Sequence, residues 1–320
     1  MAVHAFIFPG QGSQAVGMGR DLAAAFAPAR EVFQEVDETL KQKLSKLMFE
    51  GPGEELTLTE NTQPALMAIS MAVLRVLEKE GGIELKRKAA VVAGHSLGEY
   101  SALAAAGSFA IADAARLLKL RGQTMQKAVP PGMGAMAALL GADMEQAQKI
   151  CDEAATDPAT GKKEVVEAAN DNGGGQVVIS GHRTAVERAV EIAKNAGIKR
   201  AMLLPVSAPF HCALMSPAAD AMAEAFEKTP PGFPVVPLIA NVSAAKETQP
   251  DRIQELLIKQ VTATVRWREC VQAMTALGVD SFIEIGAGKV LTGLGKRIAP
   301  DATGASVSTP ADIEAILKVL

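Results

Sequence analysis

Short apolar runs alternate along the chain with longer stretches in which apolar residues recur every three or four positions. Short runs bounded by turn residues are typical of buried strands, and the longer periodic stretches are typical of amphipathic helices. Outside the middle of the chain, the predicted strands cover residues 4–8, 89–93, 235–240 and 281–285. The predicted helices there cover residues 30–48, 63–79, 111–127, 213–226, 253–260, 267–277 and 289–298. This alternation predicts an α/β fold with a mostly parallel sheet that helices cover on both faces.

The middle of the chain has a different order of elements. After a break at Pro130, Pro131 and Gly132, the pattern predicts an order β-α-β-β-α-β, which is that of a ferredoxin-like fold. The predicted strands cover residues 133–140, 164–169, 176–180 and 199–203, and the predicted helices cover 144–155 and 184–196. We therefore expect a ferredoxin-like small domain at residues 132–205, inserted into a large domain made of residues 1–131 and 206–320.

Length and charge narrow the class of protein. At 320 residues the chain exceeds the usual size of one domain, which agrees with one large and one smaller domain. The net charge of −4 provides no basic field for nucleic acid. No apolar run reaches the roughly 18 residues of a membrane span. We expect neither nucleic acid nor a membrane among the partners.

The cysteines and the start of the chain indicate the compartment. Cys151, Cys212 and Cys270 are scattered, with neither a disulfide-framework nor a zinc spacing. Met1 stands almost directly before a predicted strand, without a signal peptide. The sequence therefore predicts a cytoplasmic protein without a bound metal, and we expect it to be a monomer.

The most informative stretch is Gly94-His95-Ser96-Leu97-Gly98, between the strand at 89–93 and an alanine-rich helix. A serine at the centre of G-x-S-x-G in a strand–turn–helix context is the nucleophile elbow of serine acyl transfer. Gly94 and Gly98 allow strand and helix to pass close to the turn. The free N–H groups at the start of the helix favour a developing oxyanion. The sequence thus predicts Ser96 as a nucleophile, although so short a pattern also occurs by chance.

A serine nucleophile needs a base, and the chain has four histidines. His95 adjoins Ser96, and neighbouring side chains diverge at a tight turn. His4 begins the first strand, and His182 lies in a polar turn of the small domain. His211 lies where the chain re-enters the large domain, at a junction where clefts form. Elimination favours His211 as the base, against the alternative of a structural histidine. No acidic third member stands out, and a carbonyl group could orient the imidazole equally well.

Two further features have weaker signals. The loop Pro9-Gly10-Gln11-Gly12-Ser13-Gln14 follows the first strand but has neither the Walker nor the dinucleotide-binding motif. It offers backbone N–H groups at the end of a strand, where α/β folds bind ligands. Arg121 lies 25 residues beyond Ser96, and a guanidinium can bind a carboxylate through two parallel hydrogen bonds. On this evidence alone, a solvated charge on a helix surface is the favoured interpretation.

Taken together, these stretches resemble the bacterial malonyl-CoA:acyl-carrier-protein transacylase family, a malonyltransferase family of fatty acid synthesis. The resemblance covers nearly the whole chain in the right order. It rests on F-P-G-Q-G-S-Q at 8–14, G-H-S-L-G-E-Y-S-A-L at 94–103, the Arg121 segment, P-F-H-C-A-L-M at 209–215, A-N-V-S-A at 240–244, Gln260 with V-R-W at 265–267, and E-I-G-A-G-K-V-L at 284–291.

The resemblance implies an α/β-hydrolase-like large domain and a ping-pong acyl transfer. Ser96 would take the malonyl group from malonyl-CoA with His211 as base, and the phosphopantetheine thiol of acyl carrier protein would then collect it. Backbone N–H groups matching Gln11 and Leu97 would form the oxyanion hole. Coenzyme A and phosphopantetheine enter as parts of substrates, so no cofactor is expected.

Three more residues are interpreted through the family. Arg121 matches the arginine that pairs with the malonyl carboxylate. Gln260 matches the residue whose backbone carbonyl orients the histidine. This carbonyl would take the place of the missing acidic residue. His95 matches a motif histidine beside the nucleophile, and its role stays open. One departure is Asp171, which stands between two asparagines where an aromatic residue would be expected.

Alternatives remain at this point. A serine hydrolase or thioesterase would use the same elbow, an acyltransferase could take a different extender such as methylmalonyl, and a homologue without activity could bind the carrier. Because the carrier protein is acidic, we expect a local basic patch on this slightly acidic chain. The candidates are Lys199, Arg200, Lys296 and Arg297.

Overall fold

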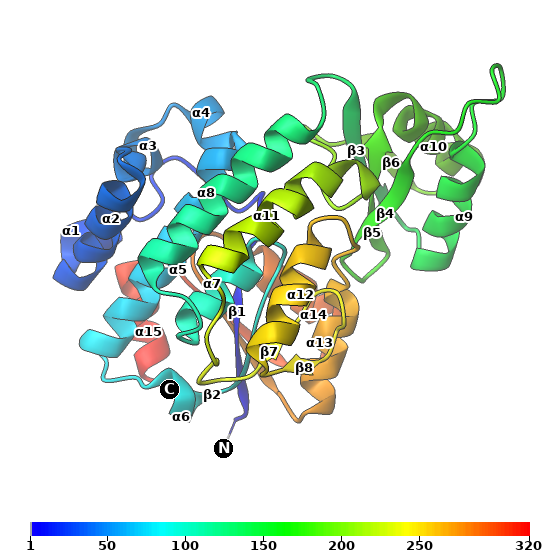
Figure 1. Cartoon of the computed structure of the whole chain (residues 1–320). Coiled ribbons are helices and arrows are strands. Elements are labelled where there is room, and N and C mark those ends of the chain that lie inside the picture. Colours follow the sequence, from blue (N-terminus) through cyan, green and yellow to red (C-terminus); the bar gives the residue numbers. More distant parts are fainter. Residues whose placement is uncertain (1) are drawn as a thin grey trace.

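The computed structural model describes residues 2–320, and its larger part is built around a six-stranded sheet (Figure 1). The strand order is β10-β9-β1-β2-β7-β8, and every neighbouring pair is parallel except β7 with β8. The predicted α/β fold with a mostly parallel sheet is confirmed. The strands are β1 (His4–Phe8), β2 (Ala89–Gly94), β7 (Leu238–Ile239), β8 (Lys246–Glu247), β9 (Ser281–Ile285) and β10 (Thr303–Val307).

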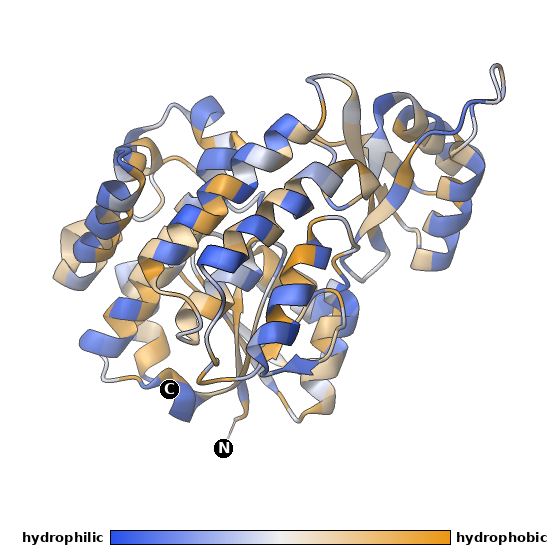
Figure 2. Cartoon of the chain, in the orientation of Figure 1, coloured by the Kyte–Doolittle hydropathy of each residue, from blue (hydrophilic) through white to orange (hydrophobic). Residues whose placement is uncertain are grey.

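Helices cover both faces of this sheet, because side chains of a strand point alternately to opposite faces. Phe6 and Phe8 of β1 pack into the core shared with α5, α7 and α8, whereas Ala5 and Ile7 pack into the core shared with α13 and α14. The helices of this part are α1 (Arg20–Ala25), α2 (Ala27–Leu40), α3 (Leu44–Glu50), α4 (Gly53–Thr57), α5 (Thr59–Lys79), α6 (Leu85–Lys88), α7 (Gly98–Ala105), α8 (Ile111–Ala128), the 3₁₀ turn η1 (Ala213–Met215), α11 (Ser216–Lys228), α12 (Pro250–Gln260), α13 (Trp267–Ala276), α14 (Val290–Ile298) and α15 (Pro310–Leu317). Figure 2 shows hydrophilic and hydrophobic residues alternating along the outer helices, as amphipathic packing requires.

A smaller antiparallel sheet with the order β4-β5-β3-β6 lies at one end of the molecule (Figure 1). Its elements are β3 (Gly134–Leu140), α9 (Met144–Ala154), β4 (Val166–Asp171), β5 (Gln176–His182), α10 (Arg183–Asn195) and β6 (Arg200–Leu203), in the order that the sequence predicts. One face, with Ala137 and Leu139, forms a separate core under α9 and α10. The other face turns Met136 and Val178 toward the large part of the molecule.

Several elements differ from the sequence prediction. The helix predicted over 30–48 is two helices, because the chain takes a left-handed conformation at Lys41 (φ 51°). The strand predicted over 235–240 is only Leu238–Ile239, since Val235 is exposed and Pro237 has no N–H to donate. β10 was not predicted, because it is a half-exposed edge strand without an apolar run. Within residues 2–320, no helix has the length and apolar character needed to cross a membrane.

Candidate active site

Ser96 occupies the turn between β2 and α7 in a left-handed conformation (φ 53°), which is strained for a residue with a side chain. The two flanking glycines make this turn possible. A Cβ atom on Gly94 would lie 1.9 Å from the carbonyl group of Gly98, and one on Gly98 would lie 2.2 Å from the carbonyl oxygen of Phe8. The predicted need for two glycines is confirmed: the elbow lies directly against β1.

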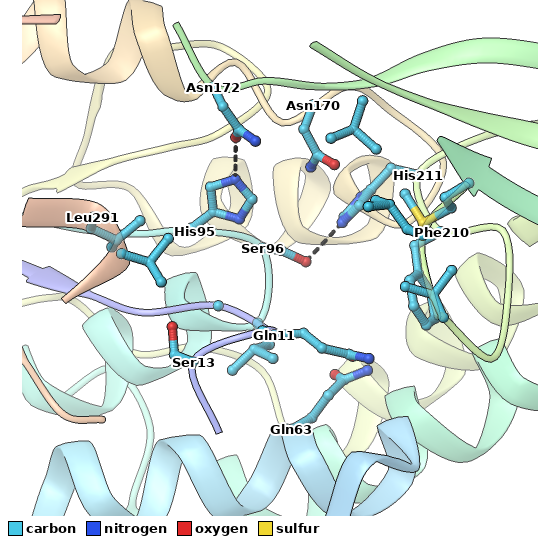
Figure 3. Close-up of a pocket in the computed structure, with 18 of the residues that line it drawn as sticks. Gln11, Ser13, Gln63, His95, Ser96, Asn170, Asn172, Phe210, His211 and Leu291 are labelled. Carbon is cyan, nitrogen blue, oxygen red and sulfur yellow. Dashed lines mark hydrogen bonds between the residues drawn. The ribbon is translucent and has the colours of Figure 1, made fainter. Parts of the chain in front are cut away.

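The Ser96 hydroxyl meets the imidazole of His211, which reaches it from 115 residues further along the chain. Ser96 Oγ lies 2.7 Å from His211 Nε2 (Figure 3). On the other side of the ring, His211 Nδ1 lies 2.8 Å from the Gln260 carbonyl oxygen. A carbonyl oxygen can only accept, so Nδ1 carries the proton. Nε2 is therefore free to accept the serine proton. A backbone carbonyl thus takes the orienting place that an Asp or Glu has in a triad.

His211 is held neutral by its surroundings. Its side chain is buried, and burial lowers the pKa of His211 to about 3, helped by the positive charge of Arg121. An imidazole that stays unprotonated is available as a base across the physiological pH range.

Arg121 lies on α8, only 1 % exposed, with its guanidinium beside the nucleophile. Its Nη2 lies 3.3 Å from Ser96 Oγ and 2.9 Å from the side-chain oxygen of Gln260, and its Nη1 donates to the Gln63 amide oxygen at 2.8 Å. Within residues 2–320, no Asp or Glu lies within salt-bridge distance of it, and its Nε has no partner. Its hydrogen bonds all go to neutral oxygens, and its guanidinium carbon lies 5.6 Å from the centre of the Tyr100 ring. A buried cation without a paired acid is suited to an anion brought by a ligand.

Two backbone N–H groups face the same space. Gln11 follows β1 and Leu97 follows the nucleophile, and both line the cavity at Ser96. In the described part of the chain, neither N–H donates to another protein group. Unpaired N–H groups beside a serine nucleophile are the donors that stabilise an oxyanion.

A cavity of about 340 Å³ joins these groups and lies between the two sheets. The large part contributes Gln11, Ser96 and His211, and the small sheet contributes Asn170 and Val178 (Figure 3). The small sheet thus forms one wall of the cavity that contains the hydroxyl. In the chain from residue 2 onward, no cluster of three or more His, Cys, Asp or Glu could hold a metal ion.

The remaining histidines do not contact the Ser96 hydroxyl, although His95 also lines the cavity. His95 turns away from Ser96, and its Nε2 lies 2.9 Å from the side-chain oxygen of Asn172 on the small sheet's hairpin (Figure 3). His182 Nδ1 accepts from the backbone N–H of Val165, and His4 lies within β1. Only His211 reaches the nucleophile.

Residues 5–309 match the family described as "Acyl transferase domain". The chain belongs to the acyl transferase family. It is 47 % identical to the malonyl CoA-acyl carrier protein transacylase of Escherichia coli K12 over 319 residues, covering all of both chains. The resemblance predicted from the motifs is confirmed, and the chain is an acyltransferase.

Solved structures of relatives have the same fold. An acyl-carrier-protein S-malonyltransferase from Bartonella henselae is 55 % identical, with a TM-score of 0.95 over 99 % of each chain. A malonyl-transacylase solved in complex with its type II PKS acyl-carrier protein is 44 % identical, with a TM-score of 0.94 over the whole of both chains.

The acyltransferase site also contains residues to which sequence reasoning gave no role. Gln63 donates to the Thr59 hydroxyl at 3.0 Å, and Thr59 donates to the side-chain oxygen of Gln11 at 2.9 Å, so Arg121 is linked through Gln63 to the loop after β1. Asn241 was noted only as part of a motif, yet its side-chain oxygen accepts from the Ser96 N–H at 2.8 Å. Neutral amides have no pattern that separates them from surface residues.

The unexpected Asp171 has a local partner. Its carboxylate accepts from Arg268 Nε at 2.8 Å and is nearly buried, and it does not line the cavity. The acid between Asn170 and Asn172 is therefore paired behind the cavity wall and does not face the nucleophile.

Proposed function

We propose that this acyltransferase moves the malonyl group of malonyl-CoA to the phosphopantetheine thiol of acyl carrier protein, through a malonyl ester on Ser96. The observation that carries the proposal is the buried Arg121 guanidinium, which meets no acid and lies 3.3 Å from Ser96 Oγ. The free carboxylate of a malonyl group would supply the missing anion. The names of the relatives agree with this substrate and this carrier.

The first half-reaction forms the ester. Ser96 Oγ attacks the thioester carbonyl carbon while its proton passes to His211 Nε2, 2.7 Å away. The negative charge on the carbonyl oxygen is stabilised by the N–H groups of Gln11 and Leu97. The carbon–sulfur bond then breaks, and the imidazolium returns its proton to the departing coenzyme A thiolate.

The second half-reaction reverses these steps with a different thiol. The phosphopantetheine thiol gives its proton to His211 and attacks the ester carbonyl carbon. The carbon–oxygen bond of the ester breaks, and Ser96 Oγ takes the proton back. Both thioesters are substrates, so the cycle needs no cofactor.

A test without carrier separates transfer from hydrolysis. With malonyl-CoA alone, the enzyme is expected to release about one equivalent of coenzyme A per active site and then to stop, because the ester is shielded from water. Free coenzyme A and malonate are measured over time. Continuous release of malonate would indicate a hydrolase, and no release of coenzyme A would indicate a carrier-binding protein without activity.

We propose that the two predicted domains have different roles in the reaction. We assign residues 1–131 and 206–320 to an α/β-hydrolase-like catalytic domain, because β2 and α7 carry the elbow in the manner of that fold. Residues 132–205 have the antiparallel order β4-β5-β3-β6 around two helices, which supports a ferredoxin-like domain. It closes the cavity over the ester.

Two of the four predicted basic residues, Lys199 and Arg297, lie beside the β4–β5 turn or the residue bonded to it. Arg297 packs on Gly174 of the β4–β5 turn, and Lys199 packs on Gly141, which is hydrogen-bonded to the same turn. Gln176, at the end of this turn, lines the cavity. All four basic side chains are exposed, which fits a patch that meets the acidic carrier while phosphopantetheine enters.

Charge reversal tests this patch. Lys296→Glu with Arg297→Glu is expected to raise the KM for acyl carrier protein roughly tenfold and to leave loading from malonyl-CoA unchanged, because rim charges act on encounter with the partner. The matched control is Lys86→Glu with Arg87→Glu on α6, which lies beside the C-terminus and away from the small sheet (Figure 1). An equal effect of both double variants would refute the assignment.

A further inference from the structure

Glu99 is a buried carboxylate that the proposed chemistry does not use. It lies in the first turn of α7, three residues after the nucleophile, and only 1 % of it is exposed. It does not line the cavity. A single oxygen, Oε2, accepts from the Gln260 side-chain amide at 2.7 Å and from the Asn241 backbone N–H at 3.1 Å.

Glu99 is the nearest of three acceptors that fix which way the Gln260 amide faces, because the same NH₂ group also lies 3.0 Å from the Ser96 carbonyl oxygen and 3.3 Å from the Asn241 side-chain oxygen. With its NH₂ group on Glu99, the Gln260 side chain turns its oxygen to Arg121 Nη2 at 2.9 Å. The reversed amide would place its NH₂ against the guanidinium, donor against donor. The backbone carbonyl of the same residue receives the proton of His211 Nδ1. Glu99 thus acts, through one residue, on both the base and the cation.

The bond to Asn241 reaches the nucleophile itself. The Asn241 side chain accepts from the Ser96 N–H at 2.8 Å and donates to the Gly94 carbonyl at 2.7 Å, so it spans the elbow. Its backbone N–H is held by Glu99. The strained turn at Ser96 therefore depends on the position of a residue that Glu99 holds in place.

We propose that Glu99 is a positioning residue whose Oε2 holds Gln260 and Asn241 in the orientation that aligns Ser96, His211 and Arg121 for acyl transfer. Because both bonds converge on one oxygen, the position of that oxygen is the larger contribution, and the negative charge, which partly offsets the lowering of the Arg121 pKa by burial, is the smaller one. Burial raises the pKa of Glu99 to about 7, so the neutral acid is accessible at physiological pH, and it can still accept through Oε2. The inference rests on the proposed function, because the rate it concerns is that of ester formation on Ser96.

Two substitutions separate the effect of the position of Glu99 Oε2 from the effect of the carboxylate charge. Glu99→Gln keeps the accepting oxygen in place and removes the charge, whereas Glu99→Asp keeps the charge and draws the oxygen back by one methylene. In single-turnover loading from malonyl-CoA, the Gln variant is expected to stay within about threefold of the natural enzyme. The Asp variant is expected to load roughly 30- to 100-fold more slowly, with the KM for malonyl-CoA changed less than threefold.

The control is Glu284, another fully buried carboxylate, which holds the start of α14 through Leu291 and Thr292. Glu284→Asp is expected to lower the melting temperature without slowing loading by the folded enzyme. Equal loading rates in Glu99→Asp and the natural enzyme, a slow Gln variant, or an Asp variant faster than the Gln variant would each overturn the positioning role. If the natural enzyme formed no ester, the proposed function would fail instead.

Discussion

Replacing His211 by alanine is expected to lower the rate of ester formation from malonyl-CoA by roughly 10³- to 10⁴-fold. In the proposed mechanism the imidazole, 2.7 Å away, accepts the Ser96 proton, and among the described residues no other histidine contacts the hydroxyl. The KM for malonyl-CoA should change little, because Arg121 and the oxyanion donors remain. Stopped-flow measurement of coenzyme A release gives both constants.

The matched control is His182→Ala, which removes a histidine that only accepts a backbone hydrogen bond in the small sheet. It is expected to load at the natural rate. A His211→Ala enzyme that still loaded within tenfold of the natural rate would contradict the assignment of the base.

The pH dependence of loading tests the lowered pKa of His211. A base with the ordinary pKa of 6.5 would lose about tenfold in kcat/KM by pH 5.5. Because burial and Arg121 lower the pKa of His211 to about 3, kcat/KM is expected to stay flat from pH 8 to pH 5.5. A bound carboxylate would offset the charge of Arg121, so kcat should begin to fall at a higher pH than kcat/KM. A fall of kcat/KM centred near pH 6.5 would contradict the environment described for His211.

Replacing Arg121 by alanine is expected to remove the preference for malonyl over acetyl groups. An acetyl group leaves the buried guanidinium without an anion, which costs on the order of 3 kcal/mol, or roughly 100-fold in kcat/KM. The variant should therefore lose at least about 100-fold with malonyl-CoA, while loading from acetyl-CoA survives or improves. Competition between the two thioesters, followed by the mass of the acylated protein, measures the ratio.

Two variants refine this result. Arg121→Lys keeps a positive charge but loses the bidentate hydrogen-bonding geometry of the guanidinium. Its preference for malonyl should therefore fall between those of the natural enzyme and the alanine variant. Arg116→Ala removes an exposed arginine from the same helix and should change nothing. If Arg121→Ala slowed both acyl groups equally, the arginine would be structural.

The reactive residues could be predicted because each combines a motif with a reactive group. Ser96 lies in a pattern that needs close-packed glycines, and His211 remained after three other histidines were excluded. The groups that orient them could not be predicted in the same way. The Gln260 carbonyl lies 49 residues from His211, and every residue has such a carbonyl. Only the resemblance to the family pointed to Gln260, and nothing in the sequence assigned Gln63 or Glu99 a function.

The same contrast holds for the fold. β1 and β9 are buried along their whole length, so their apolar runs predicted them with the right bounds. β10 is defined by its pairing with β9, and its sequence, with Gly304 and Ser306, has no apolar run. The break at Lys41 is a single left-handed residue inside a helical pattern. The periodicity of apolar residues cannot predict a strand that is defined by its pairing partner or a helix break that is defined by one backbone angle.

The central claim is that the Ser96 hydroxyl becomes a malonyl ester. The most direct measurement is the intact mass of the natural protein and of Ser96→Ala after incubation with malonyl-CoA in the absence of carrier. The natural protein is expected to gain one malonyl group, which peptide mapping places on Ser96 and which acyl carrier protein then removes. The variant is expected to gain none. A malonyl adduct of equal extent on the Ser96→Ala protein would contradict the account.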